Sequence, residues 1–156
     1  MEKTLLVKNE EETKQIALKL AALVEPGDVI LLEGNLGAGK TTFSKGLALG
    51  LGIQKTIKSP TFTIIKEYHQ GRLPFYHMDV YRLEDSGADD LGLEEYFEGD
   101  GFSVVEWAHL VAKNLPQTYL EITLNVETND VEGRKIHFKA VGTHYEQLLT
   151  VLEKQL

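Results

Sequence analysis

A glycine-rich segment that ends in a lysine and hydroxyl side chains carries the clearest chemistry in this sequence. Residues 34–41 read Gly-Asn-Leu-Gly-Ala-Gly-Lys-Thr and fit the pattern G-x-x-x-x-G-K-[ST] at every fixed position. Glycines let successive backbone N–H groups turn inward around phosphate oxygens, and a following helix adds its positive end. Lys40 is then expected to bind the β- and γ-phosphates, and the Thr41 hydroxyl to bind Mg²⁺. The pattern predicts a nucleoside triphosphate site, to which the other contributing residues are Asn35, Leu36, Gly37, Ala38, Gly39 and Thr42.

Two carboxylates, Asp79 and Glu106, stand at the ends of apolar runs. Residues 75–78 precede the first and residues 102–105 precede the second. In open α/β sheets the ligand crevice lies beyond the carboxyl ends of the strands, where these side chains would emerge. A site that hydrolyses a nucleotide needs a carboxylate near Mg²⁺ and a group that positions water. Asp79 and Glu106 are therefore candidate metal ligands and, with Lys40, candidate catalytic residues; the alternative is that each carboxylate only caps a strand.

Other polar and aromatic positions carry weaker signals. His77 shares a strand face with Asp79 by period-2 alternation, but no further His or Asp stands at ligand spacing for a transition metal. Ser59-Pro60-Thr61-Phe62 follows the expected phosphate-loop helix, where many proteins of this kind place a loop that senses the γ-phosphate; such a turn is also common without a function. Trp107, the only tryptophan, is by itself interpreted as a core or partner contact.

The reaction class follows from what accompanies the phosphate loop. No Asn-Lys pair is present for reading guanine, and the D-x-x-G match at residues 89–92 falls in an acidic segment outside any strand. Small-molecule kinases use several arginines on the transferred phosphoryl group, whereas this chain has only Arg72, Arg82 and Arg134. ATP binding and hydrolysis is the favoured class. The alternatives are a small-molecule kinase and a nucleotide-gated binding module without useful hydrolysis.

Apolar periodicity and turn residues predict the elements that must position these groups. A helix capped by Asn9, with Glu12 as its capping-box partner, is expected to run until Pro26-Gly27. Further helices are expected after the phosphate loop to near Gly52, and over 93–97, 108–114 and 144–156. Expected strands are an edge strand over 5–7, then 28–33, 61–68 with 75–80 as an antiparallel hairpin, 102–105, 119–126 and 135–141. This order predicts an α/β fold with a mixed sheet, parallel in the core plus antiparallel strands, flanked by helices.

Composition limits the class of protein. The 156 residues favour a single domain over residues 1–156. Sixteen Lys+Arg against twenty-four Asp+Glu give a net charge of −8, which argues against a protein that grips nucleic acid by itself. The absence of cysteine excludes disulfides, thiol catalysis and thiolate zinc sites. The sequence shows neither a signal-peptide pattern nor an apolar run of membrane-spanning length, so a cytoplasmic protein is expected.

Four motifs in this order resemble the TsaE (YjeE) family of small bacterial ATPases. They are residues 34–42, 59–62, His77-Met78-Asp79-Val80-Tyr81-Arg82-Leu83 and Val105-Glu106-Trp107, and the resemblance covers roughly residues 5 to 125. It implies a P-loop NTPase fold and a role in threonylcarbamoyladenosine (t6A) modification of adenosine 37 in tRNAs that read codons starting with A. It also implies two partners, the threonylcarbamoyl-transfer protein and its inactive paralogue (TsaD and TsaB types), with tRNA engaged only indirectly and no membrane involved.

The resemblance also assigns roles to individual residues. Lys40 would bind phosphate and Thr41 would bind Mg²⁺, while Thr61 would belong to a switch-like loop. Asp79 would assist the metal, and Glu106 would act near the γ-phosphate as base or metal ligand. Trp107 would lie beside the nucleotide or at the partner surface. This chain departs from the family pattern after Trp107: it has Ala108-His109, where members often carry an acidic residue or Pro-Glu. ATP binding is expected to order the loop around Thr61, and hydrolysis by the isolated chain is expected to be slow, with Arg82 the best intrinsic arginine.

Overall fold

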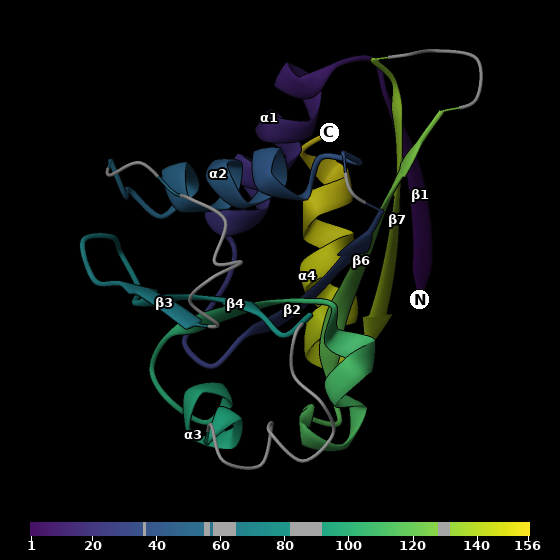
Figure 1. The fold of residues 1–156 in the computed structure, drawn as a ribbon. Coiled ribbons are helices and arrows are strands. Elements are labelled where there is room, and N and C mark those ends of the chain that lie inside the picture. The colour runs from purple at the N-terminus through teal and green to yellow at the C-terminus, as the bar shows by residue number, and fades with distance from the viewer. Residues whose placement is uncertain (36, 55–56, 58–64, 82–91, 128–131) are drawn as a thin grey trace.

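A single mixed sheet forms the centre of the molecule (Figure 1). The computed structural model describes residues 1–35, 37–54, 57, 65–81, 92–127 and 132–156. Within these residues seven strands lie in the order β1-β7-β6-β2-β5-β4-β3. Their bounds are β1 Glu2–Val7, β2 Val29–Gly34, β3 Ile65–Tyr68, β4 Phe75–Asp79, β5 Phe102–Glu106, β6 Tyr119–Val126 and β7 Arg134–Val141.

The pairing of the strands confirms the predicted mixed sheet. In the core β2 is parallel to both β5 and β6, and β4 is parallel to β5. The outer strands are antiparallel: β3 pairs with β4, β7 with β6, and β1 with β7. β1 lies at an edge, as its short apolar run predicts. Because β2, β4 and β5 run in the same direction, their carboxyl ends meet at one edge of the sheet.

Three α-helices cover one face of this sheet. They are α1 (Glu10–Ala21), α2 (Lys40–Gly50) and α4 (Thr143–Lys154), and their apolar sides join the larger buried cluster with the inward residues of the core strands. α1 and α2 approach closely because α2 has glycines at the crossing. A Cβ added to Gly46 would lie 2.7 Å from the Lys14 carbonyl oxygen and 2.7 Å from the Ala17 Cβ. The tight crossing fixes α2, the helix that follows the phosphate loop.

The other face is covered by α3 (Leu93–Phe97) and a short helix η2 (Ala108–Asn114), which pack on a second cluster. α3 has the predicted bounds. η2 was expected as an ordinary helix but is a 3₁₀ helix interrupted at Val111, whose φ is −124°. The reason is its confinement: Trp107 has a positive φ, and Leu115 is forced to extended backbone before Pro116. Among the described residues, no helix combines the length and apolar character that a membrane crossing requires.

The N-terminal helix shows how local signals set the element ends. The Asn9 side chain accepts a hydrogen bond from the Glu12 N–H at 3.0 Å, as the capping box predicts. The Glu12 carboxylate, however, accepts from the Lys8 N–H at 3.2 Å, one residue before the cap. α1 ends at Ala21, earlier than the predicted stop, because Leu23 N–H donates to the Leu20 carbonyl and tightens the chain into a turn.

The start of β2 is anchored to α4 by a tyrosine. The Tyr145 hydroxyl accepts a hydrogen bond from the Val29 N–H at 2.9 Å, and burial raises the pKa of Tyr145 to about 12. Beside it Asp28 Oδ1 lies 2.8 Å from His144 Nε2. Burial raises the pKa of the Asp28 carboxyl, while the Glu25 N–H and His144 oppose that rise. These contacts hold the end of β2 opposite to the phosphate loop.

Tyr145→Phe tests this anchor. Phenylalanine fills the same space but leaves the buried Val29 N–H without an acceptor, which costs about 1–3 kcal/mol of unfolding free energy. Urea denaturation followed by circular dichroism measures the change. Tyr119→Phe is the matched control, because the Tyr119 hydroxyl makes no hydrogen bond within the described residues. Equal stability of the two variants would refute the anchor.

Candidate functional site

The phosphate loop joins the end of β2 to the start of α2 and faces open space. Gly37 and Gly39 have φ angles of 81° and 109°, which side chains rarely adopt. A Cβ added at either position would meet nothing within 4 Å. Gly39 is the N-cap of α2 and supplies no side-chain hydrogen bond to the first turn. The N–H groups that begin α2 are therefore available for an anionic ligand.

An arginine from β7 holds the outside of this loop. Arg134 Nε donates to the Ala38 carbonyl at 3.1 Å, and Arg134 Nη2 donates to the Gly37 carbonyl at 3.3 Å. At the loop's root a Cβ on Gly34 would lie 2.6 Å from the Leu124 carbonyl oxygen. The Ala38 carbonyl shares its peptide plane with the Gly39 N–H, so holding that carbonyl on the outside turns the Gly39 N–H the other way.

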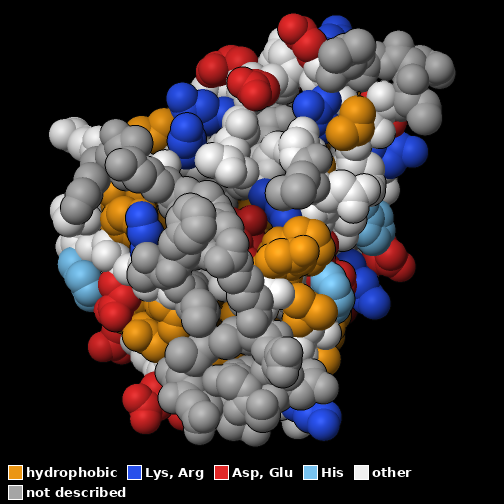
Figure 2. Space-filling view, viewed as in Figure 1, with side chains coloured by type: hydrophobic (Ala, Val, Ile, Leu, Met, Phe, Trp, Pro, Cys, Tyr) orange, Lys and Arg blue, Asp and Glu red, His pale blue; other side chains and the backbone are white. Residues whose placement is uncertain are grey.

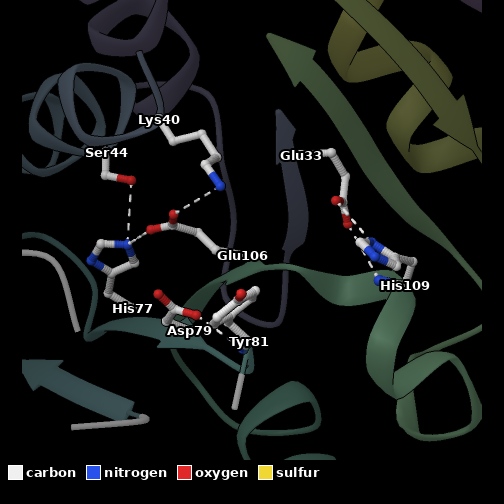
Figure 3. A network of polar contacts seen from close by, with 8 residues as sticks. All are labelled: Glu33, Lys40, Ser44, His77, Asp79, Tyr81, Glu106 and His109. Carbon is white, nitrogen blue, oxygen red and sulfur yellow. Dashed lines mark hydrogen bonds and ion pairs between the residues drawn. The ribbon is translucent and has the colours of Figure 1, made fainter. Parts of the chain in front are cut away.

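Lys40 and Glu106 form a buried ion pair at the mouth of the loop (Figure 3). Lys40 Nζ lies 3.9 Å from Glu106 Oε1, and the two side chains are only 8% and 7% exposed. The same ammonium lies 4.2 Å from the centroid of the Trp107 ring, within the range of a cation–π contact. Lys40 thus contacts both the carboxylate and the aromatic ring that the sequence singled out.

The other Glu106 oxygen has a different partner. Glu106 Oε2 lies 2.6 Å from His77 Nε2. Ser44 Oγ lies 3.4 Å from the same nitrogen. Ser44 follows Lys40 by one turn of α2, so both side chains point toward the end of β5. α2 therefore supplies one partner of the Glu106 carboxylate, Lys40, and contacts the other, His77, through Ser44.

Asp79 lies beside this pair at the end of the next strand. It is the register partner of Glu106 in the parallel pairing of β4 with β5. Its Oδ1 accepts a hydrogen bond from the Tyr81 N–H at 3.0 Å. This contact leaves the second carboxylate oxygen, Oδ2, outside that turn. The two carboxylates predicted from separate apolar runs therefore lie side by side at one edge of the sheet.

Trp107 occupies a strained turn immediately after Glu106. Its φ of 63° is the one positive value among the described non-glycine residues. The ring packs against Tyr81 at 4.8 Å between centroids. The chain beyond it is tied to the end of β2, because His109 donates its backbone N–H to Glu33 at 3.3 Å and its Nδ1 lies 3.1 Å from the same carboxylate. These contacts hold the indole ring over Lys40.

The donor groups of the site suit a magnesium nucleotide. Thr41 is exposed in the first turn of α2, and its hydroxyl with the Asp79 and Glu106 carboxylates supplies the hard oxygen ligands that Mg²⁺ prefers. Within the described residues no group of three His, Cys, Asp or Glu side chains could hold a metal alone. A metal here would share its ligands with phosphate oxygens, as the open glycine loop allows.

The structure places most of the sequence-predicted residues around one point. Gly37, Ala38, Gly39, Lys40, Thr41 and Thr42 form the loop and the first turn of α2, and Asp79, Glu106 and Trp107 close the other side. Asn35 is exposed, and its carbonyl accepts from the Ala38 N–H at 3.1 Å. Leu36, Thr61 with its Ser59–Phe62 segment, and Arg82 lie outside the described residues.

Sequence reasoning missed three contributors. Arg134 was counted only as one of three arginines, Ser44 was not considered, and His77 was assigned no partner. No local motif marks them, because their contacts join residues 96, 33 and 29 positions apart. For His77 the alternation of β4 gave a partial signal, since it places the ring on the same face as Asp79.

Arg134→Gln tests the support of the loop. Losing the guanidinium frees the Gly37 and Ala38 carbonyls, so affinity for a nucleoside triphosphate should fall about tenfold, or about 1.4 kcal/mol. Titration followed by the fluorescence of the only tryptophan, Trp107, measures it. Lys135→Gln makes the same charge change on an exposed neighbour and should retain affinity. An equal loss in both variants would show a general charge effect instead.

Comparison with known proteins identifies the family of this chain. A family model described as threonylcarbamoyl adenosine biosynthesis protein TsaE matches residues 7–136. The tRNA threonylcarbamoyladenosine biosynthesis protein TsaE of Bacillus subtilis (strain 168) is 58% identical over 146 residues, which are 94% of this chain and 90% of the relative. Its namesake from Treponema pallidum (strain Nichols) is 49% identical over 117 residues, 74% of this chain and 86% of the relative. The crystal structure of Bacillus subtilis YdiB superposes with a TM-score of 0.88 at 50% identity, covering 99% and 96% of the two chains. This chain has the P-loop NTPase fold and belongs to the TsaE family.

Proposed function

We propose that residues 1–156 act as one domain, a Mg²⁺-dependent ATPase needed for threonylcarbamoyladenosine modification of tRNA. One observation carries the proposal: the phosphate-binding Lys40 is paired with a buried acid, Glu106, at the mouth of an open phosphate loop. The modification is the one named for relatives that match most of this chain. A glycine loop alone supports nucleotide binding, whereas a carboxylate at this position adds a group that can act on water.

The chain's own groups divide the work. The N–H groups of the loop and of the first turn of α2 bind phosphate oxygens, and Lys40 leaves Glu106 Oε1 to contact the β- and γ-phosphates. That departure frees Oε1 to accept a proton from, or to orient, the attacking water. Phosphate binding and the release of the carboxylate are therefore coupled by one ammonium group.

Thr41, Asp79 and Glu106 are the residues that would hold the metal, and Trp107 would contact the nucleotide or a partner. Bound Mg²⁺ neutralises charge on the β- and γ-phosphate oxygens. Asp79 suits a supporting role, because its Oδ1 is already used by the Tyr81 N–H. Thr61 keeps its predicted place in a switch-like loop as part of the same proposal.

The charge of the chain supports action through partner proteins. The net charge is −8, and Figure 2 shows acidic and basic side chains interspersed among the described residues of the face it presents. Binding of a tRNA backbone depends on clustered cations. We therefore propose that tRNA is held by the threonylcarbamoyltransferase subunit and its inactive paralogue (TsaD and TsaB types), in the cytoplasm, and that this chain supplies the ATP cycle.

The described arginines favour hydrolysis over transfer to a small molecule. Arg72 Nη2 donates to the Ala21 and Val24 carbonyls, both at 2.8 Å. Arg134 donates to the outside of the phosphate loop. Both guanidinium groups thus bind backbone carbonyls, whereas a small-molecule kinase needs arginines on the transferred phosphoryl group.

Glu106→Gln separates binding from turnover. Removing the carboxylate's charge leaves Lys40 freer for phosphate, so ATP affinity should be equal to or tighter than wild type. Turnover should fall about 10²- to 10⁴-fold, since the group that acts on water is lost. Phosphate release and Trp107 fluorescence measure the two quantities, with Lys40→Ala as the control that loses affinity. Full turnover in Glu106→Gln would eliminate Glu106 as the catalytic group.

Reconstitution tests the proposal as a whole. ATP hydrolysis is measured with the chain alone and with the purified TsaD- and TsaB-type pair, while modified tRNA is quantified by mass spectrometry of nucleosides. We expect slow hydrolysis alone, faster hydrolysis with the pair, and modification only when all three proteins and ATP are present. Transfer of phosphate to a nucleoside or sugar would favour a kinase, and modification without hydrolysis would favour a nucleotide-gated binding module.

A further inference from the structure

Glu106 has a separate partner on each carboxylate oxygen, and the two partners differ in kind. Oε1 lies 3.9 Å from Lys40 Nζ, a contact that phosphate must displace. Oε2 lies 2.6 Å from His77 Nε2, a contact on the side of the carboxylate away from the lysine. Nucleotide binding would therefore break the contact with Lys40 and leave the contact with His77 in place.

The short contact requires a proton between nitrogen and oxygen. A bare Nε2 lone pair facing a carboxylate oxygen at 2.6 Å would be repulsive, so Nε2–H donates to Oε2. His77 is 1% exposed and the Glu106 side chain 7% exposed. With water excluded, losing this hydrogen bond would leave polar groups buried without partners. The bond is therefore maintained by its surroundings as well as by its own strength.

The imidazole ring is held in one orientation by neighbours from two elements. Phe75, two residues earlier on β4, stacks on it with 5.7 Å between centroids and 13° between planes. Ser44 on α2 lies 3.4 Å from Nε2, at the long limit of a hydrogen bond. Nδ1 makes no hydrogen bond within the described residues. The short polar contact of the ring is thus the one with Glu106, and packing fixes the ring plane.

We infer that His77 is a positioning residue for Glu106. It fixes Oε2 so that Oε1 is the oxygen directed toward the phosphate loop once Lys40 has moved to the nucleotide. This inference rests on the proposed ATPase function and adds to it which of the two Glu106 oxygens acts on water. It gives the two polar residues of the His77-Met78-Asp79 segment different roles, with Asp79 near the metal and His77 on the Glu106 carboxylate.

The inference predicts a specific kinetic effect. A chain without this donor should bind ATP normally, because Lys40, Thr41 and the loop are unchanged. Its Glu106 carboxylate can rotate, so kcat should fall about 10- to 100-fold, the range found when a group that orients a site residue is lost. A purely structural role would instead change folding stability and would not distinguish kcat from KM.

Two variants at position 77 make the test. His77→Leu removes the donor and keeps an apolar side chain against Phe75; His77→Gln replaces Nε2–H with an amide N–H. In the reconstituted complex we expect His77→Leu to lower kcat about 10- to 100-fold with KM within about twofold, and His77→Gln to retain most of the wild-type kcat. His144→Gln is the matched control, since it alters a histidine–carboxylate pair of 2.8 Å near the start of β2, and should keep wild-type kcat. A wild-type kcat in His77→Leu, or an equal loss of kcat in His77→Leu and His77→Gln, would overturn the inference.

A second readout needs no turnover. In the nucleotide-free, ¹⁵N-labelled protein, long-range proton–nitrogen spectra should show His77 as the Nε2–H form with slow exchange of that proton. The signal is assigned by its loss in His77→Gln, and Glu106→Ala should make the proton exchange rapidly. A proton found on Nδ1 alone would overturn the inference. If wild-type protein with its partners hydrolyses no ATP, the proposed function itself fails, which is distinct from active protein that is indifferent to position 77.

Discussion

A buried ammonium that needs a negative partner is the constraint on which the site depends. The Lys40 side chain is only 8% exposed and lies within reach of a single described carboxylate, Glu106, and burying either charge alone would be strongly unfavourable. The two charges therefore neutralise each other in the structure, and any anion that drew Lys40 away would have to replace the carboxylate. Under the proposed function, exchange of the carboxylate for phosphate would keep the ammonium neutralised at every stage. The ion pair also links the first turn of α2, which carries Lys40, to the end of β5, which carries Glu106.

The sheet supplies the geometry that this exchange requires. β2 leads into the phosphate loop, and its parallel neighbour β5 ends at Glu106. The lysine and the acid therefore lie at the same edge of the sheet. β4 adds His77 and Asp79 on the same face, two residues apart. α2 is pressed against α1 through Gly46, which leaves its first turn little freedom to shift. Lys40, His77, Asp79 and Glu106 thus all lie on helices or strands of the core.

The sequence predicted what depends on neighbouring residues and missed what depends on distant ones. The eight residues 34–41 form a local motif, so the phosphate loop, the strand before it and the helix after it could be predicted from spacing alone. The alternation of β4 and the acid at the end of β5 likewise indicated Asp79 and Glu106. Arg134 could not be found, because its contact with Ala38 depends on strand β7 lying two places from β2 in the sheet. The 3₁₀ form of η2 was missed because it follows from the positive φ of Trp107, which nothing in its residue type requires.

The strained turn at Trp107 is explained by the contacts on either side of it. A tryptophan with a φ of 63° costs about 1–3 kcal/mol, so other contacts must hold it there. On one side Glu106 is fixed by His77, and on the other His109 is tied to Glu33 at the end of β2. β5 ends at Glu106 and η2 begins at Ala108, so the change of direction between them falls on Trp107. The turn places the indole ring 4.2 Å from the Lys40 ammonium, where it shares the task of stabilising the charge with Glu106. Backbone strain is therefore the cost of placing a carboxylate and an aromatic ring, from consecutive residues, on the same lysine.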